Sequence, residues 1–327
     1  MKFALRKWLA AAALPLMALA TGTAWSQSWP SQPITILVGF PAGGDVDAMA
    51  RLYAESLGAR LGQRVIIENR PGASGMIAAG AVARAPADVH TLLLVPNTFA
   101  MAQHTLRTNP QTAVDVNKDF TPIIKTGRLP LLAVTAPGTG VRDLRELIAN
   151  ARAGASFTYG TPGAGSPMHI LGEMLNRAAG TRITHVPYRG VAPVVTDTLG
   201  GHLTIGWVTP AVAIPHVHAG RLIPLAIAER QRSRLLPAVP TLVELGYRDV
   251  VVGAWMGLLG PRGLPADVTA RLNTLMNEIL KLPDVATRMN ALGIEPVGGE
   301  PAVLARQIAE DEERFGKLVR EFGITAD

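Results

Sequence analysis

The chain has 327 residues, carries 31 Lys and Arg against 25 Asp and Glu, and contains no Cys. The lack of cysteine excludes disulfides, thiol chemistry and a lipid anchor at a cysteine, so the core alone must stabilise the fold, which this length allows. The basic residues are scattered without a Lys/Arg-rich run, and such a pattern disfavours nucleic-acid binding.

The N-terminal segment has the three parts of a secretory signal peptide. Lys2, Arg6 and Lys7 precede an almost wholly apolar run over residues 8–20, and small residues follow it. The apolar run is shorter than the roughly 20 residues that span a bilayer. We therefore expect cleavage after Ala24 or Ser26 and a soluble exported protein. Cleavage removes three positive charges and no negative ones, which lowers the net charge from +6 to +3.

The first third of the mature chain alternates between strand and helix patterns. Residues 34–40 form a continuous apolar run between prolines, which is typical of a strand buried on both faces. A helical pattern follows the glycines at 43 and 44, then a strand over 64–68, a small-residue helix over 75–84 and a strand over 91–95. This βαβαβ order predicts a parallel sheet.

The same alternation returns later in the chain. Strands are expected over residues 156–160, 183–188, 203–208 and 222–228. The C-terminal part is helical, with apolar stripes that begin at Val268 and Leu304. About 300 mature residues of this kind predict an α/β protein with two lobes.

No flexible tether separates the two α/β regions, so we expect rigid strands to cross between them. The best candidates are residues 131–135 and 255–260, because each is an apolar run followed by a Pro-containing turn. The predicted division is a signal peptide over residues 1–26, a first lobe over 27–130 plus 253–327, and a second lobe over 131–252.

Catalytic signatures are missing from the sequence. It has no H-E-x-x-H, no G-x-S-x-G, no phosphate-binding lysine loop and no complete G-x-G-x-x-G. His216 and His218 are two residues apart, a spacing that suits neither one helix face nor a usual zinc pair. We expect no enzyme activity, no metal and no cofactor.

Three glycine-containing strand-to-helix turns favour anion binding instead. They occupy residues 41–44, 73–75 and 161–166. A helix start offers unpaired N–H groups and a partial positive charge, and glycine lets an anion approach the backbone. Such turns lie at the carboxyl ends of parallel strands, where ligands bind, so the three predict one cleft. Most individual turns of this kind are purely structural, and that reading stays open for each of them.

Several residues near these turns have both a structural and a binding interpretation. Asp45 and Asp47 begin a helix, where carboxylates are favoured by the dipole, and for Asp45 this structural role is the stronger interpretation. Ser166 precedes Pro167 and is expected to cap its helix. A cap can still contact a ligand through its backbone.

Other candidates follow later strands. Asn97 and Thr98 come just after the third strand and are candidate polar groups of the cleft. Tyr188 and Arg189 follow another strand, and Arg189 is either a charge for a carboxylate or an ordinary surface arginine. Trp207 is either the floor of a pocket or, more commonly for a buried tryptophan, a core residue.

Motifs over nearly the whole mature chain resemble the solute-binding proteins of tripartite tricarboxylate transporters, the Bug or TctC family. The matching segments are residues 29–34, 40–44 with Asp47, 68–73, 160–167 with His169, 185–190, 196–201, 240–241 and 257–261. The resemblance implies a type II periplasmic-binding-protein fold, in which two α/β lobes joined by two crossing strands close a cleft over a ligand.

The resemblance also implies a function. Family members bind a small organic acid in the periplasm, hold its carboxylate largely by backbone amides, and pass it to membrane permease subunits. It implies a monomer without a cofactor. By position, the ligand-binding residues would be Phe40, Pro41, Ala42, Gly43, Gly44, Asp45, Asp47, Ser74, Gly75, Asn97, Thr98, Gly163, Ala164, Gly165 and Ser166, with Tyr188 and Trp207 beside them.

The sequence departs from the family pattern at three positions. Asp45 and Val46 stand where a small or hydroxyl residue and a threonine are usual, and Thr204 stands where aspartate is common. A carboxylate at position 45 would repel an anion unless it faces outward as a cap. Two other interpretations share the frame: an extracytoplasmic sensor that signals to a membrane partner, and an exported α/β enzyme.

Overall fold

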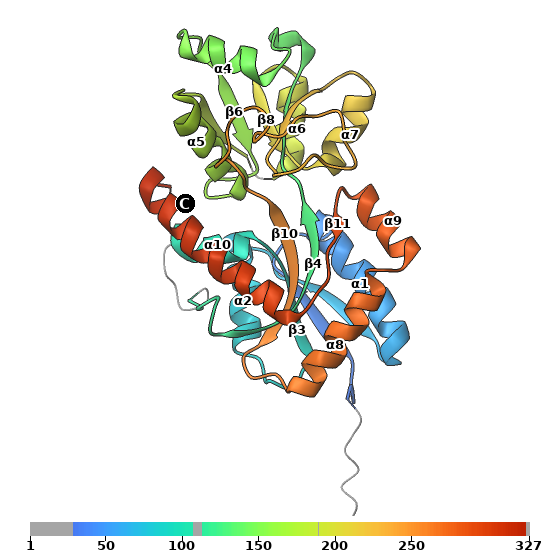
Figure 1. The fold of residues 1–327 in the computed structure, drawn as a ribbon. Helices are drawn as coiled ribbons and strands as arrows, with labels where there is room; N and C mark the ends of the chain where they lie inside the picture. The colour runs from blue at the N-terminus through green and yellow to red at the C-terminus, as the bar shows by residue number, and fades with distance from the viewer. Residues whose placement is uncertain (1–28, 107–112, 189, 325–327) are drawn as a thin grey trace, which may run out of the picture.

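Two β-sheets, one in each lobe, organise the chain (Figure 1). The computed structural model describes residues 29–106, 113–188 and 190–324. The predicted signal peptide and Arg189 lie outside these residues. None of the helices in the described ranges is long and apolar enough to cross a membrane.

The sheet of the first lobe has the strand order β11-β4-β10-β3-β1-β2. Its parallel part consists of β1 (Ile34–Val38), β2 (Val65–Asn69) and β3 (Thr91–Pro96), which confirms the predicted βαβαβ unit. The rest of the sheet is antiparallel at each pairing: β10 (Ala254–Pro261) is antiparallel to β3, β4 (Phe120–Leu129) is antiparallel to β10, and the short β11 (Glu295–Pro296) is antiparallel to β4.

Helices cover both faces of this sheet, so its strands are apolar on both sides. One face packs against α1 (Asp45–Leu61), α8 (Ala266–Ile279) and α9 (Pro283–Ala291). The other face packs against α2 (Met76–Ala83), α3 (Thr98–Thr105) and α10 (Pro301–Phe322).

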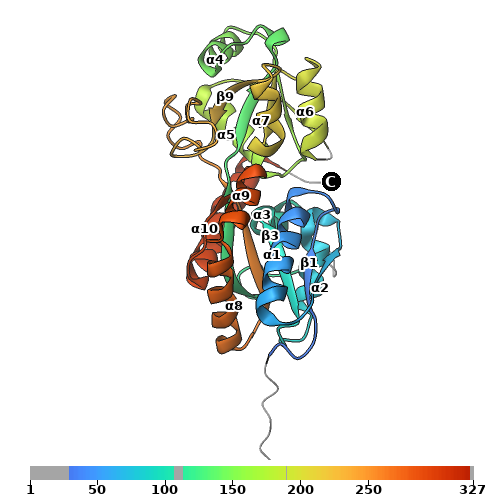
Figure 2. The ribbon, with the colours of Figure 1, turned by 90° about the vertical axis from the view of Figure 1, so that its right-hand side faces the viewer.

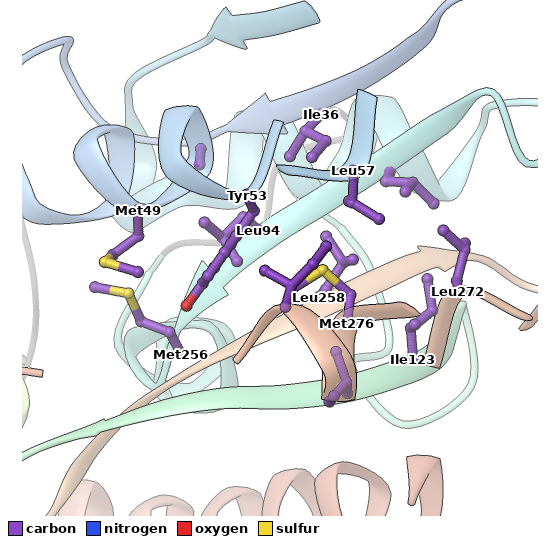
Figure 3. Packing of buried hydrophobic residues seen from close by; sticks show 14 of the residues in the cluster. Ile36, Met49, Tyr53, Leu57, Leu94, Ile123, Met256, Leu258, Leu272 and Met276 are labelled. Atoms are coloured by element: carbon purple, nitrogen blue, oxygen red, sulfur yellow. The ribbon is translucent and has the colours of Figure 1, made fainter. Parts of the chain in front are cut away.

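The core beneath α1 follows from its helical spacing. Tyr53 and Leu57 are fully buried and pack with Leu258 of β10 and Met276 of α8 (Figure 3). Each such side chain contributes about 1.5–3 kcal/mol by leaving water. The N-terminal end of α1 is thereby held rigidly against the sheet.

The second lobe is a smaller version of the same arrangement. Its sheet has the order β7-β6-β8-β5-β9. The strands β6 (Thr158–Thr161), β7 (Thr184–Pro187) and β8 (Ile205–Val208) are parallel, whereas β5 (Leu132–Thr135) is antiparallel to β8 and β9 (Ile223–Ile227). Its helices are α4 (Leu144–Arg152), α5 (Pro167–Ala179), α6 (Val191–Leu199) and α7 (Pro210–His218).

The chain passes between the lobes at the ends of the two strands that were expected to cross. It leaves the first lobe after Leu129 of β4 and enters the second at Leu132 of β5. It returns to the first lobe where β10 begins at Ala254. Residues 131–135 and 255–260 are apolar mainly because β5 and β10 are interior strands of their own sheets, so hydrophobicity alone placed the crossings a few residues late.

Helix α10 connects the two lobes a third time. Its first half contributes Leu304 and Ile308 to the core of the first lobe, and its second half contributes Phe315 and Val319 to the core of the second. The lobes stand one above the other in Figure 2, with α9 and α10 reaching their junction. The single apolar stripe predicted along this helix therefore serves two cores.

Candidate ligand-binding cleft

A cavity of about 650 Å³ lies between the two lobes. Both lobes supply its walls: the β1–α1 turn and the start of α3 come from the first, and the β6–α5 turn and the starts of α6 and α7 come from the second. Strand β10, which starts at the junction of the lobes in Figure 1, supplies Trp255 and Met256 from its first residues. A concave site of this size is suited to a small molecule.

Most of the residues predicted from the sequence are brought together here. Those that line the cavity are Phe40, Pro41, Gly43, Gly44, Asp45, Ser74, Asn97, Thr98, Gly163, Ala164, Gly165 and Ser166. They come from turns in both lobes, in the way expected for the carboxyl ends of parallel strands.

The helices that begin at this cavity mostly lack side-chain caps. No side chain caps the first turn of α1 at Gly44, of α3 at Asn97, of α6 at Gly190 or of α7 at Thr209. The first N–H groups of a helix have no partner within it, so these starts leave donors and partial positive charge beside the cavity. Four uncapped helix starts around one cavity are an arrangement that suits an anion.

The β1–α1 turn is held in shape by Asp47, which is 3% exposed and does not line the cavity. Its Oδ2 accepts from Gly43 N at 2.9 Å and from Arg51 Nε at 2.9 Å, and its Oδ1 accepts from Asn69 Nδ2 at 3.0 Å. Desolvation opposes ionisation, but the hydrogen bonds from Arg51, Gly43 and Asn69 outweigh it and hold the pKa of Asp47 below its ordinary value. Asp47 therefore stabilises the turn, whereas its neighbours line the cavity.

The β6–α5 turn has a different support. Ser166 Oγ accepts from His169 N at 3.2 Å, which confirms the predicted N-cap, and Gly165 N donates to His169 Nδ1 at 3.1 Å. The His169 ring stacks on His185 with centroids 3.7 Å apart, and His185 Nε2 lies 2.7 Å from Thr161 Oγ1. Desolvation lowers the pKa of both imidazoles to about 4, so the pair is neutral at neutral pH.

Two hydroxyls of the cavity have no partner within the described part of the chain. Thr98 Oγ1 and Thr209 Oγ1 are buried and unpaired, and they come from opposite lobes. Thr209 is only 5% exposed. A buried hydroxyl without a partner is costly, so both groups are suited to bind a polar ligand atom.

Comparisons with known proteins show the family to which the chain belongs. The family model described as the tripartite tricarboxylate transporter family receptor matches residues 49–324. The chain belongs to this family of receptors. Protein BugT of Bordetella pertussis is 35% identical over 299 residues, which cover 91% of each chain. A protein from the tcbD-tcbE intergenic region of Pseudomonas sp. strain P51 is 32% identical over 324 residues, covering 98% of this chain and 96% of the relative.

Solved structures share the fold closely. The R. palustris protein Rpa4515, solved with adipate, is 31% identical with a TM-score of 0.81 and covers 91% of this receptor and 99% of its own chain. MatC of Rhodopseudomonas palustris, solved with bound malate, is 31% identical with a TM-score of 0.76 and covers 89% and 100%. The structure of the periplasmic binding protein BugD is 29% identical with a TM-score of 0.78 and covers 91% and 100%, so the predicted periplasmic-binding-protein fold is confirmed.

Some predicted residues of the receptor lie away from the cavity. Trp207 is 1% exposed within the core of the second lobe, and Tyr188 turns its hydroxyl to Asp197 Oδ2 at 2.6 Å. Gly75 does not line the cavity either, because it lies beneath Phe40 and close to the backbone of Gly39. None of these three residues lines the cavity.

Three further residues singled out in the sequence are Ala42, His216 and His218. Ala42 is exposed at the tip of its turn and does not line the cavity. His216 Nδ1 lies 2.6 Å from Arg221 Nη2, and no group of metal-binding side chains is found within the described ranges, His218 included.

The structure also adds lining residues that sequence reasoning missed. Thr209 stands before Pro210 just as Ser166 stands before Pro167, so the same strand-to-helix signal could have found it. Gly190 at the start of α6 carried a similar signal. Trp255 and Met256 gave none, because an apolar interior strand does not reveal which of its side chains face a cavity.

Proposed function

We propose that this receptor captures a small organic acid between its lobes and delivers it unchanged to the membrane permease of a tripartite transporter. The observation that carries the proposal is the set of four uncapped helix starts, at Gly44, Asn97, Gly190 and Thr209, that meet at one cavity. A carboxylate accepts several hydrogen bonds at once, and backbone N–H groups can supply them without a lining cation.

The energies are sufficient for capture. A hydrogen bond to a charged group contributes about 1.5–3 kcal/mol net, and micromolar affinity corresponds to about −8 kcal/mol. Several such bonds, together with burial of an apolar ligand body against Trp255, reach that value after the cost of ordering the ligand. The neighbours solved with adipate and malate support an organic acid as the ligand.

The site and the compartment point to uptake rather than chemistry. The family is one of transporter receptors and the structural neighbour BugD is a periplasmic binding protein, which supports a receptor without catalysis. The signal-peptide pattern of residues 1–26 supports the periplasm as the place of capture. Delivery to a permease pair follows from the family to which the chain belongs.

Calorimetric titration of residues 27–327 with a panel of mono- and dicarboxylates tests the proposal. At least one acid should bind with saturable, one-to-one stoichiometry. Gly44→Val should weaken that binding at least tenfold, about 1.4 kcal/mol, because the new side chain occupies the start of α1. The change should spare the fold, since Gly44 has extended backbone (φ −82°, ψ 172°) and a Cβ would lie 3.6 Å from Pro41 O.

A matched control is Gly138→Val. Gly138 lies in a turn of the second lobe away from the cavity, and a Cβ there meets nothing within 4 Å. This variant should bind as the wild type does. Equal affinities of the wild type and Gly44→Val would contradict the proposed site, and a panel without any bound acid would contradict the proposed ligand class.

A further inference from the structure

Among the residues that the structure describes, one charged side chain lines the cavity, and it has the wrong sign for a site that binds only anions. Asp45 is the first residue of α1 and lines the cavity. Among the lining residues that the structure describes, no other carries a charge: the rest are glycines, hydroxyl residues, one asparagine and apolar side chains. The position that the sequence marked as a departure from the family pattern thus faces the ligand space.

The Asp45 carboxylate differs sharply from its neighbour Asp47. Asp47 accepts four hydrogen bonds, two of them from Arg51. For Asp45, the described part of the chain contains neither a hydrogen bond to its carboxylate nor an ion pair. A helix start normally favours a carboxylate, yet burial prevails here and raises the pKa of Asp45 above its ordinary value. Within the described residues, this half-buried carboxylate at the cleft therefore has no compensating partner.

A ligand can supply the missing compensation. An ammonium group beside Asp45 would form a charge-assisted pair, whereas a second carboxylate there would meet like-charge repulsion in a partly desolvated site. The remaining walls limit the rest of the ligand: Trp255, Met256, Met168 and Leu131 surround the same space. They suit an apolar body between the two charged ends.

We infer that Asp45 selects carboxylates that also bear an ammonium group, such as apolar amino acids, against dicarboxylates. The inference rests on the proposed function, because the uncapped helix starts hold the ligand's carboxylate in both cases. It adds the chemical class of the acid and the residue that determines it. The competing interpretation is that Asp45 only stabilises the first turn of α1.

A ligand series on one six-carbon skeleton separates these interpretations. Hexanoate, adipate, 2-aminohexanoate and 6-aminohexanoate are titrated calorimetrically into residues 27–327 at pH 7.5. One of the two amino acids should bind at least tenfold more tightly than adipate. Asp45→Asn should reduce the affinity for that amino acid at least tenfold and should not reduce the affinity for adipate, so that the preference narrows or reverses. Asp45→Ser should behave in the same way, and thermal unfolding of each variant reports whether it is folded.

The control variant is Asp267→Asn. Asp267 is an exposed carboxylate in the first turn of α8 and does not line the cavity, so its loss removes a helix-start charge without touching the ligand. All affinities should stay within twofold of wild type. A purely structural Asp45 predicts that its variants lower the unfolding temperature but change the affinities of all four acids by the same factor.

The pH dependence provides a second readout. Protonation of Asp45 removes the ammonium's partner, so binding of the amino acid to wild type should weaken as the pH is lowered from 7.5 toward the pKa of Asp45, which burial raises above its ordinary value. Asp45→Asn should lose that dependence for the same ligand, and comparison of one ligand between two proteins cancels the ligand's own titration. Two results would contradict the role of Asp45 without contradicting acid capture. One is a wild type that binds adipate most tightly of the four acids, and the other is the same order of affinities in the wild type and in Asp45→Asn. A wild type that binds none of a broad acid panel overturns the proposed function itself.

Discussion

The two turns that face each other across the cleft share one design and differ in chemistry. In each, a glycine with positive φ, 84° at Gly43 and 70° at Gly165, donates its N–H to the side chain four residues later. The first turn uses the carboxylate of Asp47 with Arg51, whereas the second uses the neutral ring of His169 stacked on His185. In both turns a side chain accepts the hydrogen bond of the glycine N–H. The acceptor is a carboxylate in the first turn and a neutral imidazole in the second.

The two side chains that hold these turns, Asp47 and His169, should respond differently to substitution and to pH. The carboxylate support has more partners and should cost more to remove. The imidazole support depends on neutrality and should fail first as the solution becomes acidic. The following experiments address the larger difference first.

Asp47→Ala should produce the largest loss of stability. It removes the acceptor of Gly43 N and the partner of Arg51, whereas Asn69 Nδ2 keeps its bond to Phe40 O, and we expect about 2–3 kcal/mol less free energy of unfolding. Urea denaturation of residues 27–327 measures the loss. The control is Asp267→Asn on exposed α8, which should change the free energy by less than about 0.5 kcal/mol. A loss below about 1 kcal/mol for Asp47→Ala would show that the turn is held by other contacts.

His169→Ala should cost less, about 1–2 kcal/mol, because it removes one neutral acceptor and one ring contact. His169→Asn keeps an oxygen acceptor near the position of Nδ1 and should recover part of the loss. Acid binding should fall with the alanine variant and recover with asparagine, since Gly165 lines the cavity. Equal losses for the two variants would assign the effect to packing rather than to the hydrogen bond.

The histidine pair also predicts a pH dependence of stability. Both folded-state pKa values are lowered from 6.5 to about 4, by desolvation first and, for His185, by His169 second. Between these pH values the unfolded chain binds protons that the folded protein does not bind. The neutral pair therefore makes its full contribution to stability above about pH 6.5, and this contribution falls as the pH drops toward 4. The unfolding temperature between pH 7 and pH 4 measures this. In the double variant His169→Asn, His185→Asn the fall over this range should be smaller, and an unchanged profile would contradict the neutral stack.

Of these substitutions, Ser166→Ala should have the smallest effect on stability and on ligand affinity. It removes the side-chain cap of α5, which typically costs about 1 kcal/mol, while the backbone N–H groups and the His169 contact remain. Denaturation should detect the loss, and ligand affinity should change by less than about threefold, about 0.7 kcal/mol. A larger loss of affinity would make the serine hydroxyl a ligand contact rather than a cap.

Much of the fold could be predicted because periodicity and glycine turns are local signals. The βαβαβ unit, the cap at Ser166 and the two turns of the cleft follow directly from neighbouring residues. Which of two tryptophans reaches the cavity could not be predicted: Trp207 and Trp255 both lie in apolar interior strands, and Trp255 lines the cavity only because β10 begins at the junction of the two lobes.

The roles of single polar residues could not be predicted from the sequence pattern either. Asp45 and Asp47 both begin the same helix, yet one faces the cavity and the other is buried beneath the turn. Their separation depends on the direction of each Cα–Cβ bond at the helix start, which a sequence pattern does not contain. Tyr188 likewise follows a strand, but its partner is Asp197 on the adjacent helix.

The most direct test of the account is a crystal structure of residues 27–327 grown with the acid that binds most tightly. We expect the carboxylate in the cavity between the lobes, with its oxygens within hydrogen-bonding distance, about 2.7–3.2 Å, of N–H groups in the first turns of α1, α3, α6 or α7. A carboxylate bound outside this cavity, or held there only by side-chain cations, would contradict capture by uncapped helix starts.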